Sequence, residues 1–346
     1  MSVNERPFVS LVMPAYKEEL YIEKCLESLL NQDYPADRVE ILVADGGSPD
    51  KTREIVNRIS ETHPCVRLLD NSEHRIQCYG MNIAIQASRG ELILVVDAHA
   101  KYAGDYVNKL VEVFERTGAD AAGGAMRADY HTWFQKALCA ALDSPLGVGG
   151  AAYRSAEKEG WVDVVFPGAF RRSTLEKVGL YDTNAIDNED SELFQRISEA
   201  GGKVYLSRDV VVHYYPRRNL RLLFKQYFKY GGGRARTLIV HRGLAVVRPL
   251  IPFLSVVTGL TLLIVPALRP IAPYVFGAYG ALTLLEAIRV GRKAGWWAIP
   301  VVWSIFWTLH LSHGLGMMTG LVRYFFKPLP SNVERLKPAA SAGETS

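Results

Sequence analysis

Residues 91–99 read ELILVVDAH, and this short stretch contains the pattern that decides the fold. Glu91–Val96 is a mostly apolar run that stops at Asp97, as expected for a buried strand of a parallel sheet. The same pattern occurs twice earlier in the chain, at Phe8–Met13 (FVSLVM) and Val39–Ala44 (VEILVA). We therefore expect three buried strands, each followed directly by polar or turn-forming residues.

Stretches with helical periodicity separate these runs. Glu18–Leu30 places its apolar side chains on one helical face, and Ile76–Ala87 and Asp105–Thr117 are also predicted helices. Such strand–helix alternation predicts an α/β domain with a mainly parallel sheet. The sequence contains neither GxGxxG nor GxxxxGK, so dinucleotide-dependent oxidoreductases and P-loop enzymes are disfavoured.

Three predicted strands end in chemically useful loops, and ligands of such sheets bind at the carboxyl ends of the strands. These loops are Pro14-Ala15-Tyr16, Asp45-Gly46-Gly47 and Asp97-Ala98-His99. Asp97 and His99 can bind a divalent cation that holds a diphosphate, or Asp97 can merely cap a turn beside a surface histidine. Asp45 can be a turn residue, or it can accept a hydrogen bond from a pyrimidine N–H or a ribose hydroxyl.

A cluster of carboxylates at Asn188-Glu189-Asp190 opens a predicted helix that extends to Ala200. Carboxylates in this position can simply interact favourably with the helix dipole, and Asp187 and Glu189 fit that interpretation. Asp190 is the candidate for a general base.

The chain changes character near Arg248, where long apolar runs begin. They are Pro249–Leu268, Ile271–Ile288 and Trp296–Val322, and each approaches or exceeds the roughly 18–20 residues that a helix needs to cross a bilayer. We therefore expect a membrane-bound C-terminal third rather than buried helices of a soluble domain. The third run contains polar and glycine residues and is expected to be re-entrant or bent, so the number of crossings is two or three.

Basic residues bear on orientation and on partners. Arg242, Arg248 and Arg289 flank the first two apolar runs, which predicts that these flanks are cytoplasmic. The formal net charge of +4 is too mild to indicate a nucleic-acid partner. The basic segment around residues 217–234 is expected to lie on anionic lipid, and Gln226, Lys229 and Tyr230 within it are candidates to face the active site.

Taken together, these motifs resemble those of inverting, membrane-associated family 2 glycosyltransferases with a GT-A fold. The resemblance covers residues 8–240 and rests on SLVMPAYKEELYIEKCLESLLNQDYP, EILVADGGSPDKT, YGMNIAIQASRGELILVVDAHA, FPGAFRRSTLEKVGLYD and NEDSELFQRISEAGGKVYL. Within the family the chain is most similar to succinoglycan-type exopolysaccharide transferases, which share the DAHA form and the glycine-rich segment after QYFKY.

The resemblance implies a role for each matching position. Residues implied to bind the donor are Pro14, Tyr16, Glu18, Asp45, Arg75, Asn82 and Glu189. Asp97 and His99 occupy the DxD positions that hold Mn²⁺ or Mg²⁺, and Asp190 is the implied catalytic base. Gln226, Lys229 and Tyr230 match the QxxRW motif of processive members. His213 is implied to be a further metal or diphosphate contact, with a structural role as the alternative.

Two departures from the family pattern refine this expectation. His99 replaces the last aspartate of DxD, which favours Mn²⁺ and makes metal binding depend on pH. QxxKY replaces QxxRW, which removes the bidentate guanidinium and the indole. We therefore expect one added sugar per turnover rather than processive synthesis.

The predicted protein is a GT-A catalytic domain over residues 1–240, with a nucleotide-sugar half to about residue 100 and an acceptor half after it. A membrane region over 241–325 and a polar tail over 326–346 follow. The predicted reaction moves one sugar, most simply glucose, from a UDP-sugar to a polyprenyl-diphosphate-linked saccharide in bacterial exopolysaccharide biosynthesis. The expected location is the inner membrane, with a cytoplasmic catalytic domain and other exopolysaccharide assembly proteins as candidate partners.

Three alternatives remain open from the sequence. The first is a processive synthase, which would need a membrane pore. The second is a catalytically weak nucleotide-sugar-binding subunit of an export complex. The third is a lipid-phosphate mannosyltransferase, which would use bare polyprenyl phosphate as acceptor.

Overall fold

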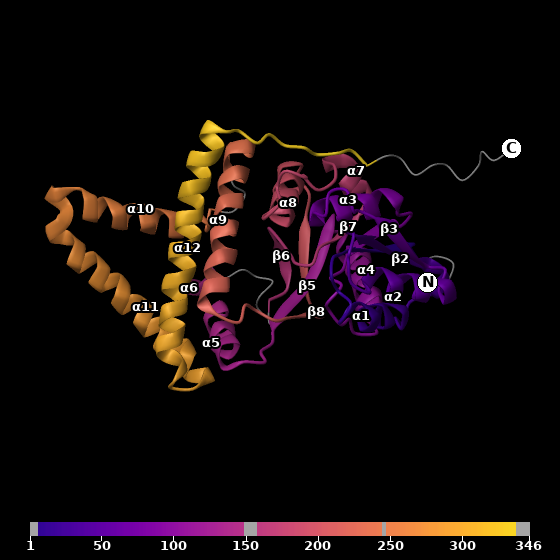
Figure 1. Cartoon of the computed structure of the whole chain (residues 1–346), viewed down its shortest axis with the longest axis horizontal. Coiled ribbons are helices and arrows are strands. Elements are labelled where there is room, and N and C mark those ends of the chain that lie inside the picture. The colour runs from indigo at the N-terminus through magenta and orange to yellow at the C-terminus, as the bar shows by residue number, and fades with distance from the viewer. Residues whose placement is uncertain (1–5, 149–157, 244–246, 337–346) are drawn as a thin grey trace. The chain divides into compact units, whose positions relative to one another are not determined.

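The computed structural model describes residues 6–148, 158–243 and 247–336 (Figure 1). The chain divides into two compact units, each treated by itself below. The first unit comprises Met1–Ala125, Glu157–Val212 and Ser331–Ser346, and the second comprises Met126–Ala156 and His213–Pro330.

A sheet of eight described strands has the order β3-β2-β1-β4-β7-β5-β8-β6. Strands β1 to β4 run parallel, whereas β7 is antiparallel to β4 and β5, and β6 is antiparallel to β8. The strand bounds are β1 Val9–Ala15, β2 Val39–Asp45, β3 Val66–Asp70, β4 Leu92–Val95, β5 Ala121–Ala128, β6 Gly160–Val162, β7 Ala169–Arg171 and β8 Val204–Tyr214. The predicted α/β class is confirmed, and its parallel part is the part with the continuous apolar runs.

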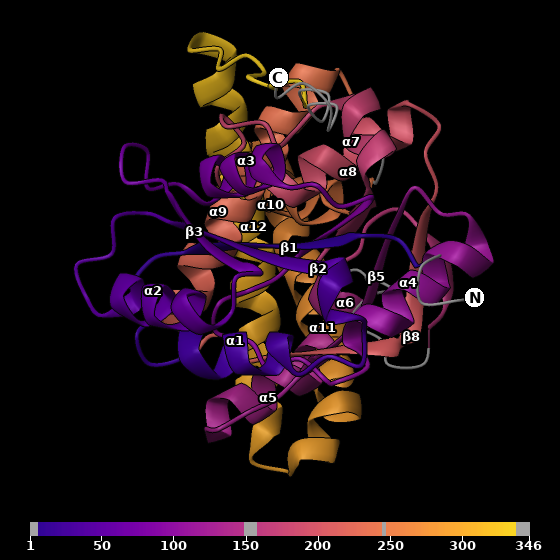
Figure 2. The same ribbon diagram turned by 90° about the vertical axis from the view of Figure 1, so that its right-hand side faces the viewer.

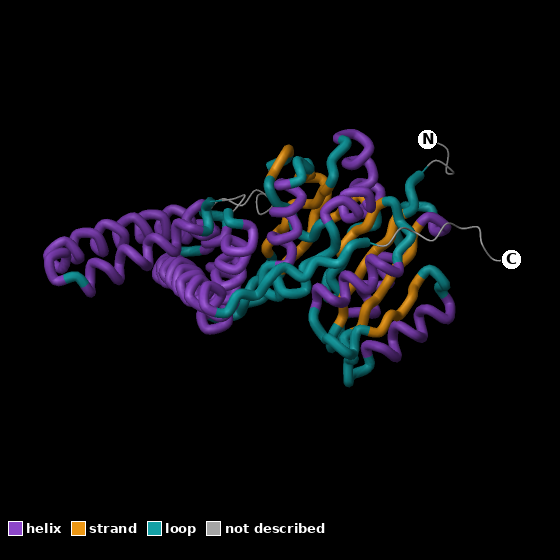
Figure 3. Tube along the Cα trace, turned by 90° about the horizontal axis from the view of Figure 1, so that it is seen from above, coloured by secondary structure: helices purple, strands orange, loops and turns teal. Residues whose placement is uncertain are grey.

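Helices flank these strands (Figure 3), and their apolar faces complete the core. Their bounds are α1 Ile22–Leu30, α2 Thr52–Thr62, α3 Gln77–Ala87, α4 Tyr106–Thr117, α7 Arg172–Val178 and α8 Glu189–Glu199, with a 3₁₀ turn at Ala36–Arg38. Helices α1 and α2 contact one another beside the parallel strands (Figure 2). Leu11, Ile41 and Leu94 at the centres of β1, β2 and β4 are fully buried, as the uninterrupted apolar runs predict.

The second unit is helical in its described part. Its elements are α5 Trp133–Leu142, α6 Pro145–Val148, α9 Leu220–His241, α10 Leu250–Ile264, the 3₁₀ helix η4 Pro266–Ile271, α11 Ala272–Ala294 and α12 Ala298–Phe326. Helices α9 and α12 lie side by side (Figure 1). A Cβ on Gly316 would lie 2.0 Å from the Phe228 carbonyl oxygen, so only glycine permits this close backbone approach.

Helices α10 and α11 form a hairpin (Figure 1). Both helices carry large exposed apolar side chains. Leu263, Tyr274 and Leu285 are 54%, 78% and 65% exposed. Exposure of these apolar side chains is unfavourable in water but not in contact with lipid. Among the described residues, one helix, Pro266–Ala294, is long and apolar enough to cross a membrane by length and composition. Helices form at all three predicted apolar runs, and the number of crossings stays a prediction.

The chain returns to the first unit after α12. Ser331–Leu336, named here the C-terminal segment, is hydrogen-bonded to residues 180–183, and Asp182 and Val333 form an antiparallel β-bridge. The sequence predicted only a polar tail beyond residue 325. The final residues, 337–346, lie outside the described part of the chain.

Candidate active site

The loops at the carboxyl ends of the parallel strands enclose a pocket of about 200 Å³. Its walls come from the loops after β1, β2, β3 and β4, as the parallel arrangement predicts. The predicted site residues that line it are Pro14, Tyr16, Glu18, Arg75, Asp97 and His99. Residues from four separate segments thus meet at one edge of the sheet.

Two of these loops contain a residue in the left-handed conformation, which side chains other than glycine rarely adopt. Lys17 has φ +62° and Arg75 has φ +55°. The first loop is held by two hydrogen bonds, from the Lys17 N–H to Ser48 Oγ at 2.9 Å and from the Glu18 N–H to Thr52 Oγ1 at 2.8 Å. Unfavourable backbone held in place by neighbouring bonds is characteristic of functional loops.

Asp45 is not among the lining residues, although its neighbours Ala44 and Gly46 are, and its contact with a base or ribose stays a prediction. Its carboxylate is fully buried and accepts hydrogen bonds from the backbone N–H groups of Gly47 and Ser48 at 3.0 and 2.9 Å. It also accepts from the Ser48 hydroxyl at 2.5 Å and from the Arg53 guanidinium at 3.1 Å. Asp45 therefore organises the turn that presents Gly46 to the pocket.

Asn82 is likewise not among the lining residues, and its implied donor contact stays a prediction. Its amide is buried on α3 and makes a reciprocal pair with the backbone of Tyr181. Nδ2 donates to the Tyr181 carbonyl, and Oδ1 accepts from the Tyr181 N–H, both at 2.9 Å. The physical role of Asn82 is to fix Tyr181.

Asp97, His99 and Glu18 form a polar cluster at the end of β4. Partial burial raises the pKa of Asp97; His99 opposes this shift and the Glu18 carboxylate adds to it. The His99 Nδ1 and the Glu18 carboxylate are 3.4 Å apart. Negative charge is thus concentrated where the resemblance places a cation.

The donor set here fits an open metal site. Within the described ranges, no group of three or more His, Cys, Asp or Glu side chains could hold a metal by itself. Asp97 and His99 would therefore supply two ligands and leave the remaining positions to diphosphate oxygens and water. Mg²⁺ is commonly bound in this way, through few side chains and substrate phosphates, and the imidazole of His99 also suits Mn²⁺.

Glu189 and Asp190 occupy the first turn of α8, as predicted. The pKa of Asp190 is raised, first by burial and next by the negative charge of Asp97, while the Tyr181 hydroxyl lowers it. The pKa of Glu189 is raised by burial and by Asp190. The structure thus brings Asp190 within electrostatic range of Asp97, from a helix that begins 92 residues later in the chain.

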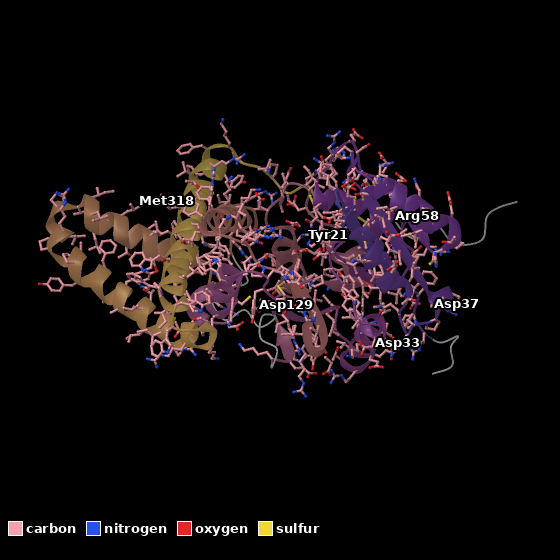
Figure 4. The ribbon with its side chains drawn as sticks, turned by 60° about the horizontal axis from the view of Figure 1, so that its bottom comes forward. Tyr21, Asp33, Asp37, Arg58, Asp129 and Met318 are labelled. Carbon is pink, nitrogen blue, oxygen red and sulfur yellow. The ribbon has the colours of Figure 1, made fainter. Side chains whose placement is uncertain are left out.

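The remaining predicted residues belong to the second unit. Gln226, Lys229 and Tyr230 lie on α9, where the Gln226 Nε2 donates to the Tyr230 hydroxyl at 2.9 Å. The His213 Nδ1 lies 2.5 Å from the carboxylate of Asp129, a residue labelled in Figure 4. Their roles in donor, acceptor or metal binding stay predictions.

Sequence reasoning missed two residues of the site. Asn71, directly after β3, lines the pocket, and its buried amide oxygen has no hydrogen-bond partner among the described residues. The position of Asn71 directly after a strand is the sequence feature that could have identified it as a pocket residue. Tyr181 is fully buried and bonded through its backbone to Asn82, but a tyrosine nine residues before a carboxylate carries no recognisable pattern.

Comparison with known proteins identifies the class. Residues 10–179 match the family model "Glycosyl transferase family 2". The succinoglycan biosynthesis protein ExoA of Rhizobium meliloti (strain 1021) is 34% identical over 280 residues, which are 80% of this chain and 79% of that protein. The chain therefore belongs to glycosyltransferase family 2 and is an inverting glycosyltransferase.

More distant similarities extend over nearly the whole chain. A Methanococcus voltae protein, dolichyl N-acetyl-alpha-D-glucosaminyl phosphate 3-beta-D-2,3-diacetamido-2,3-dideoxy-beta-D-glucuronosyltransferase, is 27% identical over 326 residues, covering 91% of this chain and 98% of its own. The mannosyltransferase PcManGT from Pyrobaculum calidifontis, solved with GDP-Man and Mn²⁺, matches with a TM-score of 0.61 at 22% identity, over 94% of this chain and 89% of that one. The latter likeness concerns the GT-A fold.

Replacing Asn82 with alanine tests its reassigned role. The substitution removes both hydrogen bonds to the Tyr181 backbone and should cost roughly 1–3 kcal/mol of unfolding free energy, with the donor dissociation constant unchanged. Thermal unfolding and UDP titration of the purified protein measure the two effects, with Asn57→Ala at an exposed position on α2 as control. Weakened UDP binding without loss of stability would instead make Asn82 a donor contact.

Proposed function

We propose that this glycosyltransferase moves one sugar per turnover from a UDP-sugar to a polyprenyl-diphosphate-linked saccharide, with inversion, in bacterial exopolysaccharide synthesis. The observation that carries the proposal is the pocket at the carboxyl ends of the parallel strands, which Asp97 and His99 line together with Tyr16, Glu18 and Arg75. The pKa of Asp190, raised first by burial and next by the charge of Asp97, supports a position of Asp190 near this pocket. A transferase that inverts configuration needs a base on one side of the sugar and charge stabilisation on the leaving group. Asp190 and Asp97 are suited to these two tasks.

The reaction would take place in one displacement. The acceptor hydroxyl attacks the anomeric carbon and forms the new glycosidic bond, while the bond to the diphosphate oxygen breaks. Asp190 accepts the hydroxyl proton, and its raised pKa increases its strength as a base. A divalent cation bound by Asp97 and His99 would neutralise charge on the diphosphate. Because UDP leaves with its negative charge stabilised, no acid is required on that side, and an α-linked donor yields a β-linked product.

Donor recognition would fall to the other lining residues. The Tyr16 ring is 42% exposed beside Gly46 and offers an aromatic surface for a nucleobase. Arg75, exposed in the same pocket, would meet the diphosphate or ribose. Solved structures with the GT-A fold include complexes with GDP-Man and with UDP-GlcNAc. UDP is proposed here because the resemblance to exopolysaccharide transferases favours it, and glucose is the proposed sugar.

A lipid-linked acceptor is supported by the apolar α10–α11 hairpin. Helix α11 belongs to the one described stretch long and apolar enough to cross a membrane, so an acceptor held in the bilayer would be available to the enzyme. Gln226, Lys229 and Tyr230 are candidates for the acceptor side. The name of the 34% identical relative, a succinoglycan biosynthesis protein, is the support for a role in exopolysaccharide assembly.

Membrane topology follows from where the chain re-enters the first unit. The chain leaves that unit after Val212 and returns at Ser331. Because the C-terminal segment is hydrogen-bonded to residues 180–183, it must lie on the same side of the membrane as the catalytic domain. We infer an even number of crossings, two at most among the three described apolar helices, rather than three.

Replacing Asp190 with asparagine tests the proposed reaction. Membranes containing the protein would receive labelled UDP-glucose, Mn²⁺ and a lipid extract with polyprenyl-linked saccharides. The native protein should extend the acceptor by a single sugar, and Asp190→Asn should lower the rate about 10²–10⁴-fold with UDP binding retained, because only the base is lost.

Asp187→Asn is the matched control, because it makes the same charge change in the loop just before α8 and should retain activity. A ladder of products would point instead to a processive synthase. Undiminished transfer by Asp190→Asn would remove this residue as the base. If no donor and acceptor pair turned over while UDP still bound, the binding-subunit hypothesis would replace the proposal.

The pH dependence of the rate provides a second test. Asp190 acts as a base only when it is deprotonated, so activity is lost as the pH falls through its pKa. Because burial and Asp97 raise that pKa, the acid side of the rate profile should lie above the range of an ordinary aspartate. Steady-state rates across acidic to mildly alkaline buffers measure it, and a constant rate down to the ordinary aspartate range would contradict the assignment.

Topology can be checked with epitope tags at the two ends of the chain. In intact spheroplasts both tags should resist added protease, and in inside-out vesicles both should be cleaved, because both ends lie on the cytoplasmic side. Cleavage of the C-terminal tag in intact spheroplasts, with the N-terminal tag protected, would indicate an odd number of crossings.

A further inference from the structure

The C-terminal segment makes a dense set of hydrogen bonds to one short stretch of the catalytic domain, Leu180–Thr183. The Asn332 N–H donates to Asp182 Oδ1 at 3.0 Å, and the Ser331 hydroxyl donates to Asp182 Oδ2 at 3.1 Å. The Asn332 side-chain amide donates to Thr183 Oγ1 at 2.6 Å. Asp182 is completely buried, so its carboxylate depends on these donors and on the Asn184 N–H at 2.9 Å.

Backbone bonds and packing reinforce this attachment. The Leu180 N–H donates to the Glu334 carbonyl at 2.8 Å, and the Thr183 N–H donates to the Asn332 carbonyl at 3.2 Å. A Cβ on Gly179 would lie 2.4 Å from Val333 Cγ1, and Gly179 has φ +84°, so glycine is required there on both counts. The segment is therefore a fitted part of the domain.

The stretch that it holds leads directly to the proposed base. Turn hydrogen bonds from the Ala185 N–H to the Asp182 carbonyl at 2.9 Å and from the Asn188 N–H to the Ala185 carbonyl at 3.1 Å join this stretch to the start of α8, which carries Asp190. From the other side, Asn82 bonds both the N–H and the carbonyl of Tyr181. Arg196 of α8 donates to the carbonyls of Val178, Gly179 and Leu180. Of these supports, only the C-terminal segment comes from beyond the membrane region in sequence.

Within the second unit, the residues just before this segment are also held. Arg236 of α9, almost fully buried, donates to the Leu329 carbonyl at 3.1 Å and to the Pro330 carbonyl at 2.7 Å. Pro330, held by the helical unit, is thus bonded covalently to Ser331, which is held by Asp182.

We propose that Ser331 and Asn332 are positioning residues for the transfer reaction: they hold Leu180–Thr183, and through this stretch the first turn of α8, so that Asp190 keeps its working position. This proposal rests on the proposed function, because it assigns Asp190 the role of base. A positioning role differs from a purely stabilising role, because its loss lowers the rate of the chemical step and not only the free energy of unfolding. It also ties the base to the membrane region through the chain itself.

The test compares the double variant Ser331→Ala and Asn332→Ala with Glu334→Ala. Glu334 contributes only its backbone carbonyl to the attachment and its side chain is exposed, so this control should behave as native. The double variant should lower kcat about tenfold to a hundredfold, because small misplacements of reacting groups have effects of this size. Donor KM and UDP affinity should stay close to those of the control, and the melting temperature should fall only by the small amount expected for the loss of two side-chain hydrogen bonds.

A conservative variant and a hydrogen-exchange measurement provide two further tests of the positioning role. Ser331→Thr retains the hydroxyl and should retain activity, whereas Ser331→Ala should lose part of it. Amide hydrogen exchange at Leu180 and Thr183 should accelerate in the double variant, and this readout needs no turnover. Full-length protein in detergent or nanodiscs serves for all variants.

The outcomes distinguish a failure of the positioning role from a failure of the proposed function. Slower chemistry with faster exchange and unchanged UDP affinity would support the positioning role. Native kcat in the double variant, or unchanged exchange at Leu180 and Thr183, would overturn it. A drop in kcat fully matched by a drop in melting temperature would assign the segment a structural role only. If the native protein transferred no sugar at all, the proposed function would fail, and exchange alone would show whether the segment holds the stretch.

Discussion

Concentration of negative charge at the carboxyl edge of a parallel sheet is the constraint on which the rest of this structure depends. Asp97, Glu18 and Asp190 are half-buried close together, and like charges in such surroundings oppose one another's ionisation. The pKa values of Asp97 and Asp190 are raised first by burial and then by this repulsion. A bound cation would relieve the charge near Asp97, while Asp190 remains a strong carboxylate base. Donor chemistry and acceptor chemistry are therefore electrostatically linked.

Three buried polar side chains of the catalytic domain hold the loops around these groups in place. The Asp45 carboxylate accepts hydrogen bonds within a turn, and the Asn82 amide bonds the backbone of Tyr181. The Asp182 carboxylate accepts hydrogen bonds from the C-terminal segment. In each case a buried polar side chain bonds backbone groups of a loop that carries a site residue. Such fully satisfied polar contacts specify a loop geometry that apolar packing alone would leave loose.

The sequence predicted the fold and the location of the pocket because both depend on local patterns. Apolar runs that stop at Pro14, Asp45 and Asp97 mark parallel strands, and parallel strands bring their ends together whatever their order. The hydrogen bonds of Asp45 and Asn82 could not be predicted from the sequence, because tertiary structure selects their partners. The C-terminal segment was missed for the same reason: six polar-rich residues have no periodicity, and their register is set by Asp182 and Gly179. Asn71 was identifiable in principle from its place after a strand.

The central claim is that the strand-end cluster binds the diphosphate of the donor through a metal held by Asp97. The most direct measurement is calorimetric titration of UDP into the full-length protein with and without Mn²⁺, for the native chain and for Asp97→Asn. The account predicts that Mn²⁺ strengthens UDP binding to the native protein and that Asp97→Asn abolishes this enhancement. Equal UDP affinity with and without Mn²⁺ in the native protein, or an enhancement that survives in Asp97→Asn, would contradict the claim.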